Sequence, residues 1–247
     1  LLARPPGLEA RGLQGLAATY VGHPLAAVIP DEPNRAGARQ RIGVDDALAL
    51  VALLPGSRRA EIAHLLPRFL QAAARMRRDR PDIRFVLPAV PALEPAIRAQ
   101  VAGSDVADAV TVLRGDAHTA LAACDATLVA SGTATLEAAL FKRPMVIAYH
   151  MHPLSWWLTQ RKRLQPWVGL PNILAQAFLV PELLQDAATP EALARETLAW
   201  LADDAAARAR RAQVVARFVE LHAALRRDTV GLTVQALEPL LARGGRP

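Results

Sequence analysis

The 247-residue sequence has one cysteine, Cys124, and aromatic residues make up only 4% of it. A single cysteine excludes an intramolecular disulfide and a metal site built from several cysteines. No apolar run approaches the roughly 18 residues of a membrane-spanning helix, because proline, glycine or charge interrupts each run. The apolar residues are mainly Ala, Leu and Val, which is typical of helices packed on a parallel sheet. We therefore expect a soluble or peripheral protein.

Basic residues outnumber acidic ones, 29 to 23, and the formal net charge is +6. The arginines are spread over several segments, so the surface favours phosphates, anionic lipid or nucleic acid. Neither a recognition-helix signature nor an aromatic-studded sheet face is present, so nucleic acid is not an expected partner.

Short strand-like runs alternate with amphipathic helical stretches from about Ala47 onward, the pattern of stacked βαβ units. Five strands are expected, at Ala47–Pro55, Ile83–Pro88, Ala109–Leu113, Ala126–Ala130 and Pro144–Tyr149. The stretches between them predict helices at Ala60–Arg78, Leu93–Ala102, Asp116–Cys124 and Thr133–Phe141. The predicted fold class is α/β, an open parallel sheet with helices on both faces and its ligand site at the carboxyl edge.

The two ends of the chain depart from this pattern. Pro190–Ala242 predicts consecutive helices that cover the sheet or pack on another domain. The opening stretch is rich in Pro, Gly and Arg, and its strand-like piece Ala18–Ala26 suggests the last strand of a preceding unit followed by a linker. The chain begins at Leu1 without an initiator Met, so we expect an N-terminally incomplete protein.

The segment "LLPGSRRAEI" places Gly56, Ser57 and Arg58 between a strand and a helix. Gly56 permits a tight turn, Ser57 can cap the helix, and free N–H groups at a helix start attract an anion. Arg58 adds a forked cationic donor suited to a diphosphate. The alternative is a capped helix with a solvated arginine. A Walker loop is excluded, since the second glycine and the Lys-Ser/Thr pair are missing.

The segment "ASGTATLE" repeats this arrangement after the fourth strand. Ser131 or Thr133 can cap the helix, Gly132 lets a ligand approach the backbone, and Glu137 lies about one turn into the helix. A carboxylate there can accept both hydroxyls of a ribose. It can equally be an ordinary acid near a helix start. Two such turns on one edge favour a nucleotide diphosphate.

The segment "PLSWWLTQRKRLQPWVGLPNIL" combines aromatic and basic side chains. It resembles an interfacial membrane patch, or else a core tryptophan beside a solvated basic face, and its residues of interest are Trp156, Trp157, Arg161, Lys162 and Arg163. Asn172 follows a proline and is expected in a loop. His150 and His152 lack a third ligand nearby, so no metal site is expected.

Four segments, in this order and spacing, closely resemble bacterial lipid-A-disaccharide synthase, and they are Leu53–Ile62, Val129–Pro153, Leu170–Ala175 and Leu179–Ala194. The resemblance extends from Val21 to the end of the chain. It implies a GT-B inverting glycosyltransferase with Rossmann-like domains. Its reaction joins UDP-2,3-diacylglucosamine to 2,3-diacylglucosamine 1-phosphate, releasing UDP and lipid A disaccharide 1-phosphate.

The resemblance also implies roles for the residues above. Arg58, with Gly56 and Ser57, would bind the donor diphosphate and stabilise the departing UDP, and no metal or other cofactor is implied. Ser131, Gly132 and Thr133 would bind phosphates, Glu137 the ribose, and Asn172 would face the donor cleft. The acylated substrates imply a cytoplasmic enzyme, peripheral on the inner membrane through the aromatic and basic patch, and leave a homodimer open.

The resemblance implies three regions: 1–41 as the end of the acceptor-side domain and a linker, 42–190 as the UDP-sugar-binding domain, and 191–247 as C-terminal helices. The chain departs from the family pattern at His150, where an arginine is usual, and at Gln176 and Ala177, where Gly-Arg is usual. The family's first half, with its general base, is outside these residues. Another GT-B UDP-sugar enzyme, or a non-catalytic UDP-sugar-binding or membrane-binding fragment, remains an alternative.

Overall fold

The computed structural model of this protein describes residues 19–150 and 166–244. Its centre is a parallel six-stranded sheet in the order β3-β2-β1-β4-β5-β6. The strands are β1 Leu50–Leu54, β2 Arg84–Ala89, β3 Val110–Arg114, β4 Ala126–Ala130, β5 Met145–Tyr149 and β6 Glu182–Leu184. The five predicted strands are confirmed. The sixth is a three-residue edge strand, too short to show a sequence period.

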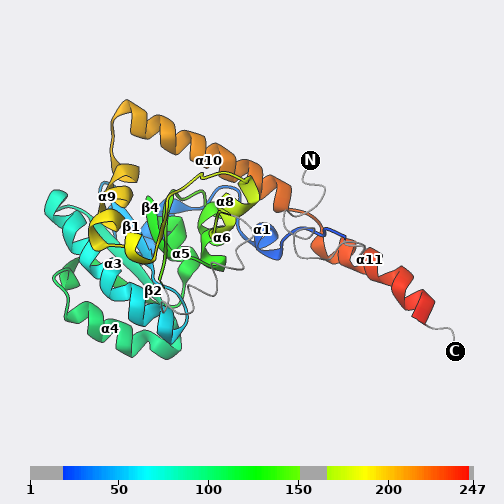
Figure 1. The fold of residues 1–247 in the computed structure, drawn as a ribbon, viewed down its shortest axis with the longest axis horizontal. Coiled ribbons are helices and arrows are strands. Elements are labelled where there is room, and N and C mark those ends of the chain that lie inside the picture. Colours follow the sequence, from blue (N-terminus) through cyan, green and yellow to red (C-terminus); the bar gives the residue numbers. More distant parts are fainter. Residues whose placement is uncertain (1–18, 151–165, 245–247) are drawn as a thin grey trace.

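Helices cover both faces of the sheet (Figure 1). One face carries α3, α4 and α9, which are Arg59–Asp79, Glu94–Ala102 and Pro190–Leu201. The other carries α5, α6 and α8, which are Ala117–Ala123, Thr133–Leu140 and Leu170–Ala175. The long helix α10, Ala205–Leu225, packs on α6, α8 and α9, and α11, Thr229–Gly244, extends away from the sheet (Figure 1). The predicted helices are thus confirmed within a residue or two at their ends.

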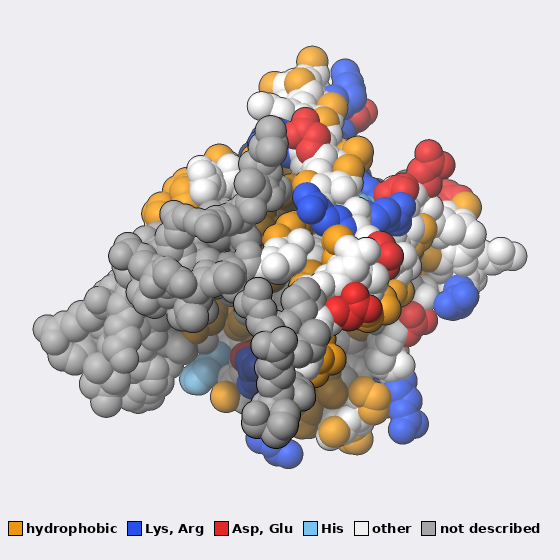
Figure 2. All heavy atoms as spheres, turned by 90° about the vertical axis from the view of Figure 1, so that its right-hand side faces the viewer, with side chains coloured by type: hydrophobic (Ala, Val, Ile, Leu, Met, Phe, Trp, Pro, Cys, Tyr) orange, Lys and Arg blue, Asp and Glu red, His pale blue; other side chains and the backbone are white. Residues whose placement is uncertain are grey.

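The centre of the sheet forms the hydrophobic core. Every residue of β1 and β4 is buried, as expected of parallel strands covered on both faces. In α3 the buried side chains recur at helical spacing, and they include Leu65, Leu66, Phe69 and Met76. At the surface, the face in Figure 2 shows acidic and basic side chains interspersed over the described residues. The core therefore fixes the sheet, and the loops at its edges are free to carry function.

The opening residues differ from the strand-like prediction for Ala18–Ala26. Helix α1 spans Pro24–Val28, with Pro24 in its first turn and the His23 Nδ1 atom accepting a hydrogen bond from the Leu25 N–H at 3.2 Å. Proline lacks an N–H and has a helix-compatible φ, so it starts this helix where a strand was predicted. A second helix, α2 at Arg35–Ile42, occupies the predicted linker and packs against α5.

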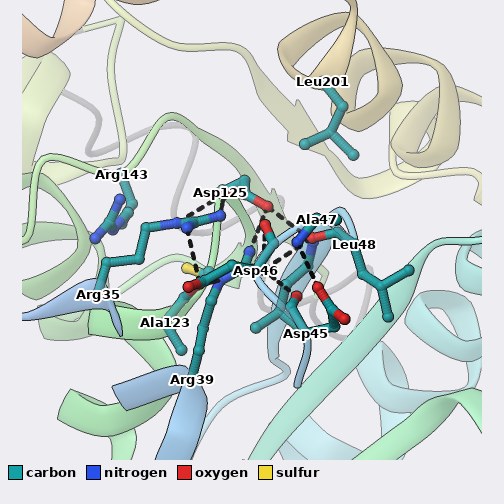
Figure 3. A network of polar contacts seen from close by, with 12 residues as sticks. Arg35, Arg39, Asp45, Asp46, Ala47, Leu48, Ala123, Asp125, Arg143 and Leu201 are labelled. Carbon is teal, nitrogen blue, oxygen red and sulfur yellow. Dashed lines mark hydrogen bonds and ion pairs between the residues drawn. The ribbon is translucent and has the colours of Figure 1, made fainter. Parts of the chain in front are cut away.

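Arg39 attaches α2 to the amino edge of the sheet (Figure 3). Its side chain is 1% exposed. The guanidinium donates to the Asp125 Oδ2 atom at 2.8 Å and to the carbonyls of Ala123, Asp45 and Leu48 at 2.9, 2.8 and 2.9 Å. The Asp125 Oδ2 atom also accepts the Leu50 N–H at 2.9 Å. This buried network joins α2 to the first residues of β1 and β4.

Candidate functional site

The carboxyl ends of β1 and β4 lie side by side, since Leu54 pairs with Val129 in parallel register. Helix α3 leaves β1 toward one face of the sheet, and α6 leaves β4 toward the other (Figure 1). The strand order also reverses between these two strands. Ligands of open α/β sheets bind at such a switch point. The two predicted turns, 56–58 and 131–133, therefore lie at the switch point of the sheet.

The β1–α3 turn is closed by a carboxylate that the sequence analysis missed. The Glu61 Oε2 atom accepts hydrogen bonds from the Ser57 and Arg58 N–H groups at 3.0 and 3.2 Å, and its Oε1 atom accepts one from Arg58 Nη1 at 2.6 Å. Arg58 is the N-cap residue, so the prediction that Ser57 caps the helix is wrong. An acid three residues after the cap is the readable signal of this reciprocal arrangement.

The turn has a backbone conformation that favours glycine and a charged side chain in solvent. Gly56 has φ +112°, a conformation that side chains rarely allow. The Arg58 side chain is 82% exposed and keeps donors besides Nη1 available. Burial acts to raise the pKa of Glu61, but the hydrogen bonds from Ser57 and Arg58 outweigh it and hold this pKa below its usual value. An anion can therefore approach the exposed Arg58 side chain, whereas the Ser57 and Arg58 N–H groups already donate to Glu61.

The β4–α6 turn is open. Gly132 is the N-cap of α6 at φ +153° and ψ −162°, and no side chain among the described residues caps the helix. The predicted caps are wrong: the Ser131 Oγ atom donates to the Val168 carbonyl at 3.1 Å, and Thr133 is the exposed first residue of the helix. A side chain added at Gly132 would meet open space. The start of α6, with a glycine in place of a capping side chain, therefore has the character of an anion-binding helix N-terminus.

Glu137 lies one turn further along α6 and faces α5. Its Oε2 atom is 3.4 Å from the His118 Nε2 atom, and the two side chains are 21% and 44% exposed. The His118 ring packs on the Phe141 ring, with centroids 5.2 Å apart. No local sequence pattern points to His118, because its contact with Glu137 crosses between two helices. The carboxylate is accessible and has one nearby partner that a ligand hydroxyl can replace.

Asn172 differs from its predicted position in a loop. It is a buried residue of α8, and its Nδ2 atom donates to the Val180 carbonyl at 2.9 Å and to the Glu182 Oε1 atom at 2.8 Å. Its Oδ1 atom accepts the N–H groups of Leu179 and Val180 at 2.9 and 3.1 Å. The carboxamide therefore has all four of its hydrogen bonds within the chain. The predicted direct contact with a ligand is wrong, and Asn172 supports β6 instead.

A third group of polar side chains lies where β5 ends. Arg68 of α3 reaches His150, with 3.1 Å between Nη2 and Nε2, and the rings of His64 and His150 have centroids 5.4 Å apart. Among the described residues, no group of three or more His, Cys, Asp and Glu side chains is arranged to hold a metal ion. The aromatic and basic patch at Trp156, Trp157 and 161–163 lies outside the described residues.

Residues 12–236 match the family described as Lipid-A-disaccharide synthetase. The lipid-A-disaccharide synthase of Albidiferax ferrireducens is 55% identical over 236 residues, 96% of this chain and 60% of that protein. The chain belongs to the lipid-A-disaccharide synthase family. The Pseudomonas syringae family member is 50% identical over 93% of this chain and 58% of its own length. The chain thus spans about 60% of the length of these two relatives.

Solved structures confirm the predicted GT-B type of fold. A structure titled "S. aureus MnaA-UDP co-structure" has a TM-score of 0.60 at 12% identity, over 97% of this chain and 59% of that one. Acinetobacter baumannii MurG has a TM-score of 0.52 at 16% identity, over 91% and 57%. Within the described residues, no helix has the length and apolar character to cross a membrane.

Proposed function

We propose that this chain is the UDP-sugar-binding part of an inverting lipid-A-disaccharide synthase. The whole enzyme would transfer 2,3-diacylglucosamine from its UDP donor to 2,3-diacylglucosamine 1-phosphate. The observation that carries the proposal is the pair of turns at the switch point between β1 and β4, one with an exposed arginine and the other with an uncapped helix start. The UDP in the S. aureus structure of similar fold supports the choice of nucleotide.

Each of the two turns would bind one phosphate of the diphosphate. The N-terminus of α6 gives N–H groups and the positive end of a helix dipole to one phosphate, and Gly132 lets that phosphate approach the backbone. Arg58 gives a permanent positive charge to the other phosphate. When the bond to the sugar breaks, negative charge grows on the departing UDP, and Arg58 with the helix N-terminus stabilises it in the transition state.

Glu137 is the proposed partner of the ribose. Its carboxylate can accept two hydroxyl hydrogen bonds, and a ligand hydroxyl would take the place of His118 at Oε2. The acylated sugars place the enzyme at the cytoplasmic surface of the inner membrane, with Trp156, Trp157, Arg161, Lys162 and Arg163 as the proposed contacts. Acceptor and membrane binding would complete the site in the whole enzyme.

Calorimetric titration with UDP and with pyrophosphate tests the site. Glu137→Ala should lower the affinity for UDP about tenfold or more, because hydrogen bonds to a charged group contribute roughly 1.5–3 kcal/mol. The affinity for pyrophosphate should stay almost unchanged. The matched control is Glu191→Ala, which removes an exposed acid paired with Arg75. Equal weakening of both ligands would contradict the ribose role.

An assay of disaccharide formation separates the remaining alternatives. It compares this chain with a longer protein that also contains the part of its relatives that this chain does not span. UDP binding with turnover only in the longer protein supports the proposal. Binding without turnover in either form favours a non-catalytic UDP-sugar-binding protein. Turnover with UDP-N-acetylglucosamine but not with the acylated donor favours another GT-B enzyme.

A further inference from the structure

The β4–α6 turn is joined by hydrogen bonds to residues 168–170, where α8 begins. The Ser131 Oγ atom donates to the Val168 carbonyl at 3.1 Å, and the Thr135 Oγ1 atom accepts the Leu170 N–H at 3.2 Å. Ser131 and Thr135 lie on either side of Gly132, the N-cap of α6. The turn is therefore connected to the start of α8 at two points that flank its glycine.

Thr135 makes the central contacts of this arrangement. Its side chain is buried, and its Oγ1 atom donates to the Gly132 carbonyl at 2.7 Å while it accepts the Leu170 N–H. A hydroxyl has one donor and two acceptor lone pairs, so Thr135 can serve both partners. The Thr135 N–H also donates to the Gly132 carbonyl, at 3.1 Å. Gly132 is thus held through its carbonyl, while the side where a Cβ would stand meets open space.

Glu182 attaches residues 168–170 to the sheet. Its Oε2 atom accepts the Val168 N–H at 2.9 Å, and its Oε1 atom accepts the Gly169 N–H at 2.9 Å. Glu182 is the first residue of β6 and pairs with Ile147 of β5. Gly169 is buried, and a Cβ atom added there would collide with the Ile147 Cδ1 atom. Residues 168–170 therefore link the turn to β5 and β6 through close packing and paired hydrogen bonds.

We propose that Thr135, with support from Ser131 and Glu182, positions the turn at the start of α6 that would bind a phosphate. This role rests on the proposed function. Phosphate oxygens accept hydrogen bonds, and a hydroxyl has one proton to donate. Ser131 and Thr135 already donate theirs to the carbonyls of Val168 and Gly132, so neither hydroxyl would be a phosphate ligand. Both act through the backbone of the turn, whose N–H groups stabilise an anion best when they are fixed before it binds.

Calorimetric titration of two valine variants with pyrophosphate tests the positioning role. Thr135→Val keeps the side-chain volume but removes the hydroxyl that contacts Gly132 and Leu170. The matched control is Thr197→Val, because Thr197 is equally buried and its hydroxyl donates to the Leu193 carbonyl at 2.7 Å, within α9. We expect Thr135→Val to lower the affinity about three- to tenfold and Thr197→Val to leave it unchanged. Thr135→Ser, which keeps the hydroxyl, should bind as the unchanged protein does. Equal affinities in the two valine variants would overturn the proposal.

The support from Glu182 is tested by amide hydrogen exchange. Glu182→Gln replaces an accepting oxygen by a donating NH2 group opposite N–H donors, so the amide protons of Val168 and Gly169 should exchange faster. The affinity for pyrophosphate should fall in the same direction as in Thr135→Val. Faster exchange with an unchanged affinity would remove Glu182 from the proposal.

Melting temperature and turnover separate positioning from a purely structural role. Both valine variants should melt lower, because each loses a buried hydroxyl hydrogen bond. In the whole enzyme, only Thr135→Val should lower kcat, with KM for the acceptor unchanged, because the turn would stabilise the departing UDP. An unchanged kcat in Thr135→Val would show that Thr135 only supports the fold. Failure of the proposed function gives a different result: neither UDP nor pyrophosphate would bind the unchanged protein, and that outcome refutes the positioning role as well.

Discussion

Replacing Arg39 by methionine should destabilise the protein strongly, because Arg39 is a buried charge with a charged partner. Methionine keeps much of the apolar volume but removes the ion pair with Asp125 and the hydrogen bonds to four carbonyls. Asp125 keeps Arg35 at 2.9 Å, but the carbonyls of Ala123, Asp45, Asp46 and Leu48 lose their donor. We expect a cost of about 3–5 kcal/mol, since each polar group left buried without a partner costs about 1–3 kcal/mol. That is a large share of the roughly 5–15 kcal/mol by which a domain is stable.

Arg35→Met is the matched control in the same network (Figure 3). Arg35 also contacts Asp125, at 2.9 Å, but its side chain is 36% exposed and Asp125 keeps Arg39 as a partner when Arg35 is lost. Pairs of this exposure contribute about 0–1 kcal/mol. The two substitutions therefore remove similar side chains from one carboxylate, and the burial of Arg39 together with its carbonyl acceptors predicts their different costs.

Urea denaturation followed by tryptophan fluorescence measures the difference. Trp200 is buried and donates to the Met145 carbonyl at 3.0 Å, so its emission reports the packing of α9 on the sheet. With an m-value of about 2–3 kcal/mol per M, the midpoint should fall by about 1–2 M in Arg39→Met and by less than about 0.5 M in Arg35→Met. Equal midpoints would refute the argument that the buried network anchors α2.

Two further predictions concern the β1–α3 turn and α10. Gly56→Ala should cost about 2–4 kcal/mol in stability and weaken UDP, because the new Cβ would lie 2.7 Å from the Glu61 Cβ atom at φ +112°. Gly43→Ala, at φ +68° in open space, should cost only about 1–2 kcal/mol by the same denaturation assay, and equal costs would disprove the clash. Burial, followed by the charges of Lys142 and Arg226, lowers the pKa of His222, so its neutral form is the native one. The unfolded chain then binds the extra proton, and stability should be full above about pH 6.5 and decline by at most about 1.4 kcal/mol per pH unit below it. The decline, measured as the urea midpoint between pH 5 and 7.5, should be smaller in His222→Gln, and an unchanged slope would exclude this residue as a cause.

The local pattern of the sequence predicted most of the fold. The alternation of buried strands and amphipathic helices gave β1 to β5 and α3 to α6, because buried parallel strands and one-sided helices each have their own period. The family could also be predicted from the sequence, because each of its motifs is a contiguous run of residues. The short strand β6 and the helix at Pro24–Val28 were missed, because three residues show no period and because Pro24 in the first turn, with His23 as the cap, outweighed a strand-like composition.

What the sequence determined by itself was the position of the two turns, 56–58 and 131–133, and the presence of a carboxylate after the second. The closing of the first turn is local as well, since Glu61 lies three residues after the N-cap Arg58 and folds back on it. Only the tertiary structure decided that Asn172 is satisfied inside the chain, because packing brings its carboxamide to Leu179, Val180 and Glu182. The meeting of Arg68 with His150, 82 positions apart, likewise depends on how α3 packs across the sheet edge, which no local pattern encodes.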